Sequence, residues 1–514
     1  MNLTARIVLL CAAALCYGVQ AVYFTHMFQL NSYRDERYHK WMNDHPDRIW
    51  NVRRMMPVLC LIAALLPLNE WIRCFIGAGV LALAALLNLP PKAKKPLVVT
   101  ARVKRLFAAE ALVLAVLLAV SWLIGVWRGL FLLGLCDAVV WLWVRIAGFL
   151  TAPLEKRIAD GYVEDARRRL AAHTSMTVIG ITGSYGKTST KNFLHALLSA
   201  RYNVLMTPEN YNTTMGVVRT IRERLQPSHQ IFLAEMGAKN VGDIREICEL
   251  VHPTMGVITS IGEQHLETFG SIDNIVRTKF ELADALPADG TVFLNTDNDY
   301  IRSRAVACRR MGYGLQPSDY TASDLTVDGS GSSFTVTAPD GSSRRFTTRL
   351  LGAHNIQNLV GCIAVAHTMG IPLDELVYPV RLLQPVEHRL QLLPNGFIDD
   401  AYNANPAGFR AALDVLSGFA GRRVLVTPGM VELGERQDAL NREAGAYAAS
   451  RCDYAILVGE KQAPPLLAGL RDGGFPEDRV FVAKTLQEGL AHLRGLPPEK
   501  EQIVLLENDL PDNF

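Results

Sequence analysis

The sequence predicts an α/β protein in three parts: helical membrane segments in residues 1–153, a doubly wound central domain in residues 154–376, and a smaller Rossmann-like domain in residues 377–514. Three observations support this fold class. Long apolar runs are confined to the first part. A glycine-rich turn at residues 180–190 follows a short apolar run and opens a segment with helical periodicity. Apolar runs of strand length then alternate with amphipathic segments, which is typical of parallel sheets covered by helices.

The first part carries about five apolar segments of membrane-spanning character. The second segment is short for a full span and is separated from the third only by Asn69 and Glu70, so these two could form a hairpin or one broken, partly re-entrant unit. The five segments are residues 5–28, 55–68, 71–89, 108–127 and 130–151.

Two basic loops predict the orientation of these segments. Residues 31–54 and 92–105 are rich in arginine and lysine, whereas the turns near Glu70 and Arg128 carry little charge. Because positive residues favour the cytoplasmic side, five spans with the N-terminus outside leave the soluble domains in the cytoplasm. We therefore expect a multi-pass protein of the cell membrane, in contact with membrane lipid. A cleaved signal peptide in residues 1–22 is disfavoured, because further spans follow it.

Two carboxylates lie within the apolar segments and raise the question of a functional site. Glu110 is near a segment end, where we expect it to be solvated. Asp137 could pair with Arg145, two helical turns further on, or with a lipid head group or a neighbouring helix. For Asp137 we expect a packing or anchoring role rather than transport.

The glycine-rich stretch has the layout of a phosphate cradle. It reads Gly180-x-x-Gly183-x-x-Gly186-Lys187-Thr188, a variant spacing of the common phosphate-binding loop (P-loop). Backbone N–H groups of such a loop converge on phosphates, the lysine reaches the β and γ oxygens, and the threonine hydroxyl is offered to Mg²⁺. A plain glycine-rich turn is the alternative. We predict ATP and Mg²⁺ as cofactors, bound by Gly183, Ser184, Tyr185, Gly186, Lys187, Thr188 and Ser189.

The remaining soluble chain alternates strands and helices. Buried strands are expected at residues 177–181, 230–233, 256–260 and 291–294, and a hairpin insertion at residues 324–350. A second alternating set builds the smaller domain. Its strands are expected at residues 423–426, 454–458, 479–482 and 502–506.

Polar groups stand at the ends of these strands, where open α/β sheets hold their ligands. Glu235 ends one strand and could share a Mg²⁺ with Thr188, and His265 follows the next strand as a second possible metal ligand. Taken alone, His265 is more often a structural histidine, and Lys279 a solvated helix lysine. Together with the loop they form a plausible ATP·Mg²⁺ site.

Composition excludes some classes of function. The net charge of +2 excludes a polycation, and although it argues neither way for nucleic acid, we predict no nucleic-acid partner. The nine cysteines are scattered, with no C-x-x-C pair, so neither a zinc site nor a disulfide framework is indicated.

Eight motifs follow one another in the soluble part. They are the loop Gly180 to Thr188, residues 209–216 (Glu-Asn-Tyr-Asn-Thr-Thr-Met-Gly), Glu235-Met-Gly, His265, Lys279, residues 352–358 (Gly-Ala-His-Asn-Ile-Gln-Asn), residues 387–390 (Glu-His-Arg-Leu) and residues 400–406 (Asp-Ala-Tyr-Asn-Ala-Asn-Pro). In this order they resemble the Mur ligase family over about residues 177–506. The last motif is most similar to that of the members that add a D-alanyl-D-alanine unit.

The resemblance implies roles for individual residues. Lys187 and Thr188 would hold the phosphates and Mg²⁺, with Glu235 and His265 completing the metal shell, and Lys279 matches a lysine that is carbamylated in several members. Nucleotide contacts would come from Asn355 and Asn358 near the adenine or the domain hinge, Arg389 at the γ-phosphate and Asp400 at the ribose. The expected catalytic residues are Lys187, Lys279, His265 and Arg389. The expected substrate residues are Asn210, Asn212, Thr213, Asn403 and Asn405.

The resemblance also implies a reaction, that of an ATP-dependent, ADP-forming carboxylate–amine ligase of peptidoglycan precursor metabolism. The carboxylate takes the γ-phosphoryl group to form an acyl phosphate, an amine attacks, and phosphate leaves, while cations offset the charge on the transferring group. Domain closure would bring Arg389 in and exclude water. The expected partners are ATP, an amino acid or dipeptide as amine donor, and a muropeptide-like or lipid-linked carboxylate.

Two departures from the family pattern bear on the substrate. Residues 150–177 leave no room for the domain that holds the uridine nucleotide in relatives, and residues 502–512 stand where a Lys-Gly-Ser motif is usual. We therefore expect a carboxylate substrate presented at the membrane, to which D-alanyl-D-alanine or an amino acid is added. The alternatives are a poly-amino-acid synthetase or an amidating relative of the same superfamily and, from other classes, a membrane transport ATPase or a nucleotide-binding scaffold without turnover.

Overall fold

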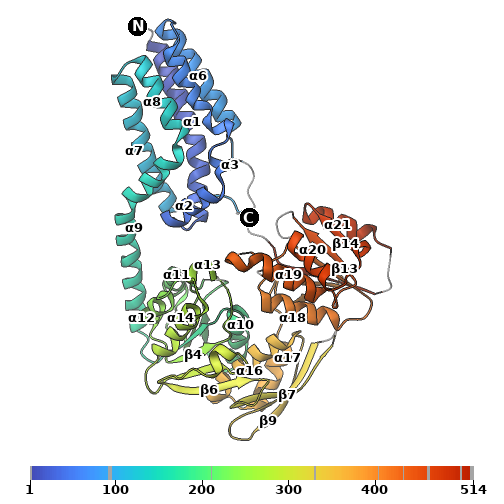
Figure 1. The fold of residues 1–514 in the computed structure, drawn as a ribbon. Coiled ribbons are helices and arrows are strands. Elements are labelled where there is room, and N and C mark those ends of the chain that lie inside the picture. Colours follow the sequence, from blue (N-terminus) through green and yellow to red (C-terminus); the bar gives the residue numbers. More distant parts are fainter. Residues whose placement is uncertain are drawn as a thin grey trace. The chain divides into compact units, whose positions relative to one another are not determined.

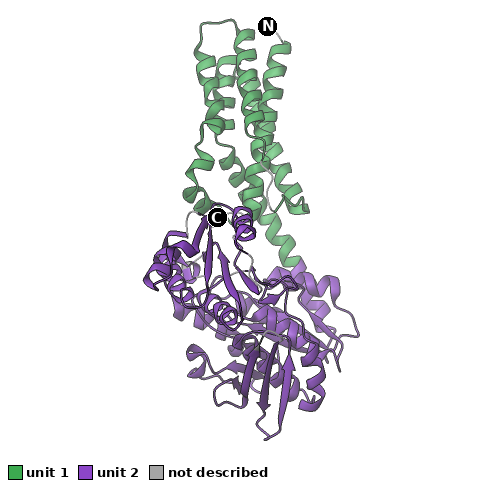
Figure 2. Cartoon of the chain, turned by 90° about the vertical axis from the view of Figure 1, so that its right-hand side faces the viewer, with its two compact units in different colours: residues 1–161, 513 green, residues 162–512, 514 purple. Residues whose placement is uncertain are grey.

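The computed structural model describes residues 3–90, 95–209, 211–264, 266–328, 331–402, 404–431, 433–459, 463–497 and 501–509. Contacts divide the chain into two compact units, residues 1–161 and residues 162–512 (Figure 2). The predicted membrane part corresponds closely to the first unit. The two predicted soluble domains lie together in the second unit.

The first unit is built from helices, several of which run alongside one another (Figure 1). They are α1 (Leu3–Leu30), α2 (Asp35–Asp44), α3 (Pro46–Ile49), α4 (Val52–Met55), the 3₁₀ helix η1 (Met56–Val58), α5 (Leu59–Leu65), α6 (Glu70–Leu87), α7 (Ala101–Leu123), α8 (Val126–Ala138) and the first part of α9 (Val140–Ala171). Small side chains, among them Ala13 and Cys16 of α1 and Ala78 and Ala85 of α6, line the buried contact between α1 and α6. Small residues let apolar helices approach closely.

Three helices of the described chain, α1, α6 and α7, are long and apolar enough to cross a membrane. A fourth span results if α8 and α9, which meet at a bend of 76°, are counted as one. The described residues thus hold three or four candidate spans, and the expected number of about five stays a prediction. The apolar stretch 55–68 is divided among short helices because Pro57 lacks the N–H that a continuous helix needs. The seven residues of α5 reach only about 10 Å.

The two carboxylates of the apolar segments are placed differently from the prediction. Glu110 is 2% exposed, not solvated, and it accepts a hydrogen bond of 2.7 Å from the Thr25 hydroxyl. Arg145 does not pair with Asp137, because its guanidinium forms two hydrogen bonds with the Asp35 carboxylate, at 2.6 and 2.7 Å. Asp137 is buried as well. The hydrogen bond between Thr25 and Glu110 thus connects α1 to α7.

A nine-stranded sheet forms the first half of the second unit, with the strand order β2-β3-β1-β4-β5-β6-β7-β8-β9. Strands β1 to β7 are parallel, and β7, β8 and β9 form the antiparallel insertion. The strands are β1 (Thr177–Thr182), β2 (Val204–Met206), β3 (Ile231–Glu235), β4 (Met255–Ile258), β5 (Thr291–Asn295), β6 (Arg309–Gly314), β7 (Tyr320–Asp328), β8 (Gly331–Thr337) and β9 (Ser343–Thr348). The strands β2 and β6 were not predicted.

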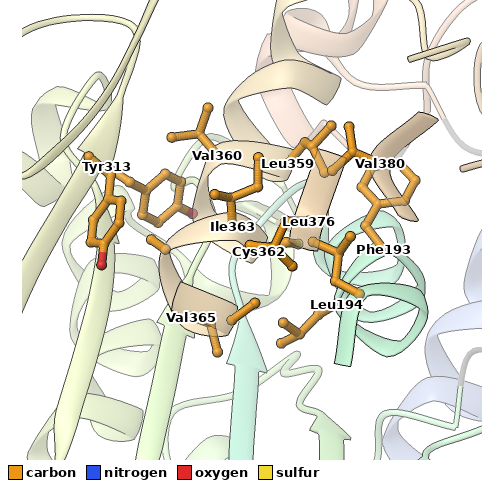
Figure 3. Close-up of a cluster of buried hydrophobic side chains, with 14 of the residues drawn as sticks. Phe193, Leu194, Tyr313, Leu359, Val360, Cys362, Ile363, Val365, Leu376 and Val380 are labelled. Carbon is orange, nitrogen blue, oxygen red and sulfur yellow. The ribbon is translucent and has the colours of Figure 1, made fainter. Parts of the chain in front are cut away.

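Helices cover both faces of this sheet. Ile179 and Ile181 of β1 enter one core, while Val178 between them enters the other. Figure 3 shows part of the first core, in which Phe193 and Leu194 of α10 lie near Leu359 and Ile363 of α16. The helices of this half are α10 (Lys187–Leu198), α11 (Thr214–Arg224), α12 (Asp243–Val251), α13 (Leu266–Phe269), α14 (Ile272–Asp284), α15 (Asp299–Arg302), α16 (Ala353–Thr368) and α17 (Leu373–Leu382). The predicted α/β fold is confirmed.

A six-stranded sheet, in the order β10-β11-β15-β12-β13-β14, forms the other half of the unit. Only β10 is antiparallel to its neighbour. The strands are β10 (Gln391–Leu392), β11 (Phe397–Asp400), β12 (Arg422–Thr427), β13 (Tyr454–Val458), β14 (Val480–Ala483) and β15 (Gln502–Glu507). The helices are α18 (Pro406–Ser417), the 3₁₀ helix η2 (Gly434–Arg436), α19 (Gln437–Ala448), α20 (Ala463–Asp472), the 3₁₀ helix η3 (Glu477–Arg479) and α21 (Leu486–Gly495).

Candidate nucleotide site

The glycine-rich loop joins β1 to α10, as the sequence predicts. Two of its glycines have positive φ, +151° at Gly183 and +78° at Gly186. A Cβ at Gly183 would lie 2.0 Å from the Thr259 hydroxyl, and one at Gly186 would lie 2.7 Å from the Asn358 amide. Glycine is therefore required at both positions, because a side chain would push the loop away from β4 and α16.

Lys187, at the start of α10, folds back onto its own loop. Its ammonium donates to the carbonyl oxygens of Gly183 at 2.7 Å and Ser184 at 2.9 Å. Burial lowers the pKa of Lys187 to about 8, Arg389 lowers it as well, and Glu235 acts in the opposite direction. The Lys187 ammonium therefore lies at the position where the phosphate groups of a nucleotide would contact the loop.

Glu235, at the end of β3, is the centre of a buried hydrogen-bond network. Its Oε1 atom accepts from the Thr188 hydroxyl and from the Asn212 amide, each at 3.1 Å. Its Oε2 atom is 2.9 Å from the Lys191 ammonium. Burial alone raises the pKa of Glu235, but Lys191 and Lys187 more than reverse that effect, so the pKa lies below its usual value. Glu235 is therefore a carboxylate at neutral pH.

Lys191 is a site residue that the sequence analysis missed. It lies one turn after Lys187 in α10, is 1% exposed, and also donates to the carbonyl oxygen of Glu209. Glu209 has a φ of +43° in the loop that carries Asn212. Lys191 therefore connects α10 to Glu235 and to this loop. No local sequence pattern distinguishes Lys191 from other helix lysines.

The donor set around Glu235 fits Mg²⁺. Carboxylate and hydroxyl oxygens are ligands that this hard cation prefers, and it commonly takes only one or two protein ligands beside water and phosphate oxygens. Among the described residues, no group of three or more His, Cys, Asp or Glu side chains is arranged to hold a metal ion. The second predicted metal ligand, His265, lies outside the described residues. Thr188 and Glu235 are the pair that the structure brings together.

Lys279 lies on α14 and is 3% exposed, so it is not a solvated helix lysine. Burial lowers its pKa well below the usual range, and Lys187 lowers it further. Its ammonium is 6.0 Å from the centre of the Phe269 ring. A lowered pKa increases the share of the neutral amine.

A cavity of about 390 Å³ extends from the loop to the six-stranded sheet. Its lining includes Tyr185, Gly186 and Ser189 on one side and Arg389, Asp400 and Glu507 on the other. This volume lies in the range of small-molecule sites. Arg389 is close enough to lower the pKa of Lys187, and its guanidinium lies 4.4 Å from the centre of the Tyr402 ring. Arg389 therefore lines the cavity, and Lys187 lies directly after Gly186, a lining residue of the loop.

The other predicted residues either line the cavity, cap a helix or lie outside the described residues. Asn355 and Asn358 line the cavity, and Asn355 also donates to the Leu351 carbonyl oxygen at 2.9 Å. Thr213 and Asn405 are helix caps, which accept from the backbone N–H of Gly216 and Gly408, and only Asn405 also lines the cavity. Asn210 and Asn403 lie outside the described residues, and their predicted roles stay predictions.

Comparison with known proteins identifies both halves of the second unit. Residues 181–366 match the Mur ligase middle domain, and residues 388–506 match the domain described as "Mur ligase, glutamate ligase domain". The UDP-N-acetylmuramoyl-tripeptide–D-alanyl-D-alanine ligase of Escherichia coli (strain K12) is 35% identical over 294 residues, 55% of this chain and 65% of that protein. The ligase of the same name from Bacillus subtilis (strain 168) is 31% identical over 334 residues, 63% of this chain and 70% of that protein.

A solved structure agrees with these relatives. The MurF ligase of Thermotoga maritima in complex with ADP has a TM-score of 0.62 and 25% identity, covering 68% of this chain and 80% of that chain. The fold and the site thus define a phosphate-binding α/β protein with two sheets beside one cavity. The chain belongs to the Mur ligase family. It spans 65% of the length of its Escherichia coli relative.

Proposed function

We propose that the protein is an ATP-dependent, ADP-forming ligase of peptidoglycan precursor synthesis, which joins D-alanyl-D-alanine or an amino acid to a muropeptide-like carboxylate. The names of the relatives support this assignment. The observation that carries it is the electrostatic proximity of Lys187 and Arg389, one from each half of the second unit, beside a cavity that Arg389 and the loop residue Gly186 line. Two cations in a partly buried site suit a triphosphate whose terminal group is transferred.

The side chains divide the work of the reaction. The substrate carboxylate oxygen attacks the γ-phosphorus, the bond to the β-bridging oxygen breaks, and ADP leaves. Lys187 and Arg389 stabilise the negative charge that develops on the transferring group. An amine then attacks the acyl carbon and phosphate departs, leaving an amide. Mg²⁺ held by Thr188 and Glu235 would offset further charge on the phosphates. As part of the proposal, Lys279 is the carbamylated lysine, since its neutral amine is the form that reacts with CO₂.

We further propose that the first unit anchors the protein in the cell membrane, with the second unit in the cytoplasm, and that the carboxylate substrate is lipid-linked or otherwise presented there. The three or four candidate spans support the anchor. The basic loops at residues 31–54 and 92–105 support the orientation.

The decisive experiment measures ADP formation by the full-length protein in detergent or nanodiscs, with D-alanyl-D-alanine as the amine donor. A UDP-linked muropeptide and a lipid-linked precursor with the same peptide are compared as carboxylates. We expect ADP release that requires both carboxylate and amine, with the lipid-linked substrate used better. Equal or better use of the UDP-linked substrate would refute membrane presentation, and ADP release that depends on neither would refute the ligase.

The pKa of Lys187 predicts a pH dependence. The side chain is charged below its pKa and neutral above it, so its contact with phosphate weakens as pH rises through about 8. We expect kcat/KM for ATP to decline above about pH 8, with a limiting slope of −1 in the logarithmic plot. In Lys187→Arg, whose guanidinium stays charged, this decline should be absent. The same decline in Lys187→Arg would assign it to another group.

A further inference from the structure

Two carboxyl groups end neighbouring strands on the wall of the cavity. Asp400 of β11 and Glu507 of β15 are paired in register, and their side chains interact. Glu507 is 1% exposed, and its Oε2 atom has no hydrogen-bond partner among the described residues. An acceptor that is buried without a partner is costly. This atom therefore points to a missing hydrogen-bond donor.

The other carboxylates that line the cavity are already engaged by the protein. Asp297 accepts from the backbone N–H groups of Leu315 at 2.7 Å and Gln316 at 2.9 Å, and from the Gln357 amide at 2.7 Å. Glu263 forms an ion pair with Arg436. Asp400 accepts a hydrogen bond from the backbone N–H of Leu390 at 3.1 Å and shares a second one with the Glu507 side chain. Among the carboxylates of this lining, the Asp400 and Glu507 pair is therefore the one with oxygen atoms still able to accept a hydrogen bond from a ligand.

The position of the pair relates it to the phosphate end of the cavity. Arg389 acts electrostatically on Lys187 and also on Asp400. One guanidinium thus lies near both the loop that would hold phosphates and the carboxyl pair. In a nucleoside triphosphate, the group that follows the phosphates is the ribose, which presents two adjacent hydroxyl donors.

The chemistry of the pair favours a neutral ligand group over a cation. Burial raises the pKa of Glu507 well above its usual range, the Asp400 carboxylate raises it further, and burial raises the pKa of Asp400 to about 6. Both shifts favour the protonated forms, which carry less negative charge. Less charge on the pair suits hydroxyl donors better than an ammonium ion.

We propose that Glu507 is a nucleotide-specificity residue, which together with Asp400 receives the 2′- and 3′-hydroxyls of the ATP ribose. This inference rests on the proposed function as an ATP-dependent ligase. It assigns to Glu507 a contact that the sequence comparison placed on Asp400 alone.

The test measures binding by calorimetry to the full-length protein, with ADP, 2′-deoxy-ADP, 3′-deoxy-ADP and 2′,3′-dideoxy-ADP as ligands. For the wild type we expect each deoxy position to weaken binding by about tenfold, as for hydrogen bonds to charged groups. In Glu507→Ala, ADP should bind about tenfold more weakly, and the ratio of ADP to dideoxy-ADP affinity should shrink by the same factor. Glu507→Gln, which keeps an acceptor, should retain most of the ratio.

Glu501→Ala is the matched control, because Glu501 is an exposed residue immediately before the same strand and outside the cavity lining. It should bind all four ligands as the wild type does. Equal wild-type affinities for ADP and dideoxy-ADP would overturn the inference, as would an unchanged ratio in Glu507→Ala. Either result leaves the proposed ligase standing if ADP binds. A wild type that binds no ADP would overturn both.

Discussion

Replacing Lys187 with alanine is expected to lower kcat/KM for ATP-dependent ligation by about 100- to 1000-fold, the usual cost of losing one preorganised group that stabilises transition-state charge. The loop should keep its fold, because its course is also fixed by the positive φ values of Gly183 and Gly186 and by the Ser184 N–H, which donates to the Ser260 carbonyl oxygen. The measurement is ADP formation by the full-length protein at saturating carboxylate and amine.

Lys239→Ala is the control for Lys187→Ala, since Lys239 is exposed on the same half of the unit and lies outside the cavity lining. It should retain full activity. If Lys187→Ala stayed within about threefold of the wild type, the loop could not be the site of phosphoryl transfer. Folding must be followed by hydrogen exchange rather than tryptophan fluorescence, because all seven tryptophans lie at or before residue 143, in the first unit.

Replacing Lys191 with methionine is expected to destabilise the second unit by about 3–5 kcal/mol, because it leaves the buried Glu235 carboxylate without its cation. The protection of backbone amides from hydrogen exchange should fall in β1, β3 and α10, while peptides of the first unit serve as an internal reference. The folded-state pKa of Glu235 is below its usual value, so the stability from this pair is present above the ordinary carboxyl pKa and is lost as pH falls through the folded value.

The double variant Lys191→Met/Glu235→Gln separates the ion pair from packing. It removes the unpaired charge as well as the lysine, so it should recover most of the lost protection while remaining inactive as a ligase. An effect of Lys191→Met that persisted undiminished in the double variant would show that lost packing, rather than the uncompensated carboxylate, causes the instability.

Features with a local pattern could be predicted from the sequence. The loop between β1 and α10 follows from glycines at required spacings, and Gly183 and Gly186 have the positive φ values that explain them. Glu235 could be placed because it directly ends an apolar strand, and the ends of parallel strands share one edge of the sheet. The antiparallel insertion followed from alternating residues and turn signals.

Features that depend on distant partners could not be predicted. Lys191 has the sequence surroundings of any helix lysine, and only its contact with Glu235 on another element reveals its role. Glu507 pairs with Asp400 through strand register, which a single sequence does not disclose. Arg145 bonds to Asp35, 110 positions away, instead of to the nearer Asp137. The division of residues 55–68 into short helices is different, because it has a local signal: Pro57 interrupts an apolar run whose hydropathy alone predicts one continuous segment.

The resting position of Lys187 bears on turnover. Because its ammonium already donates to the Gly183 and Ser184 carbonyl oxygens, an arriving phosphate exchanges hydrogen bonds with the loop instead of adding them to a bare charge. The net gain from such an exchange is small compared with the strength of each bond. When ADP departs, the lysine returns to the same two oxygens, so product release leaves no unsolvated cation behind. These two hydrogen bonds would thereby reduce the free-energy cost of emptying the site between cycles.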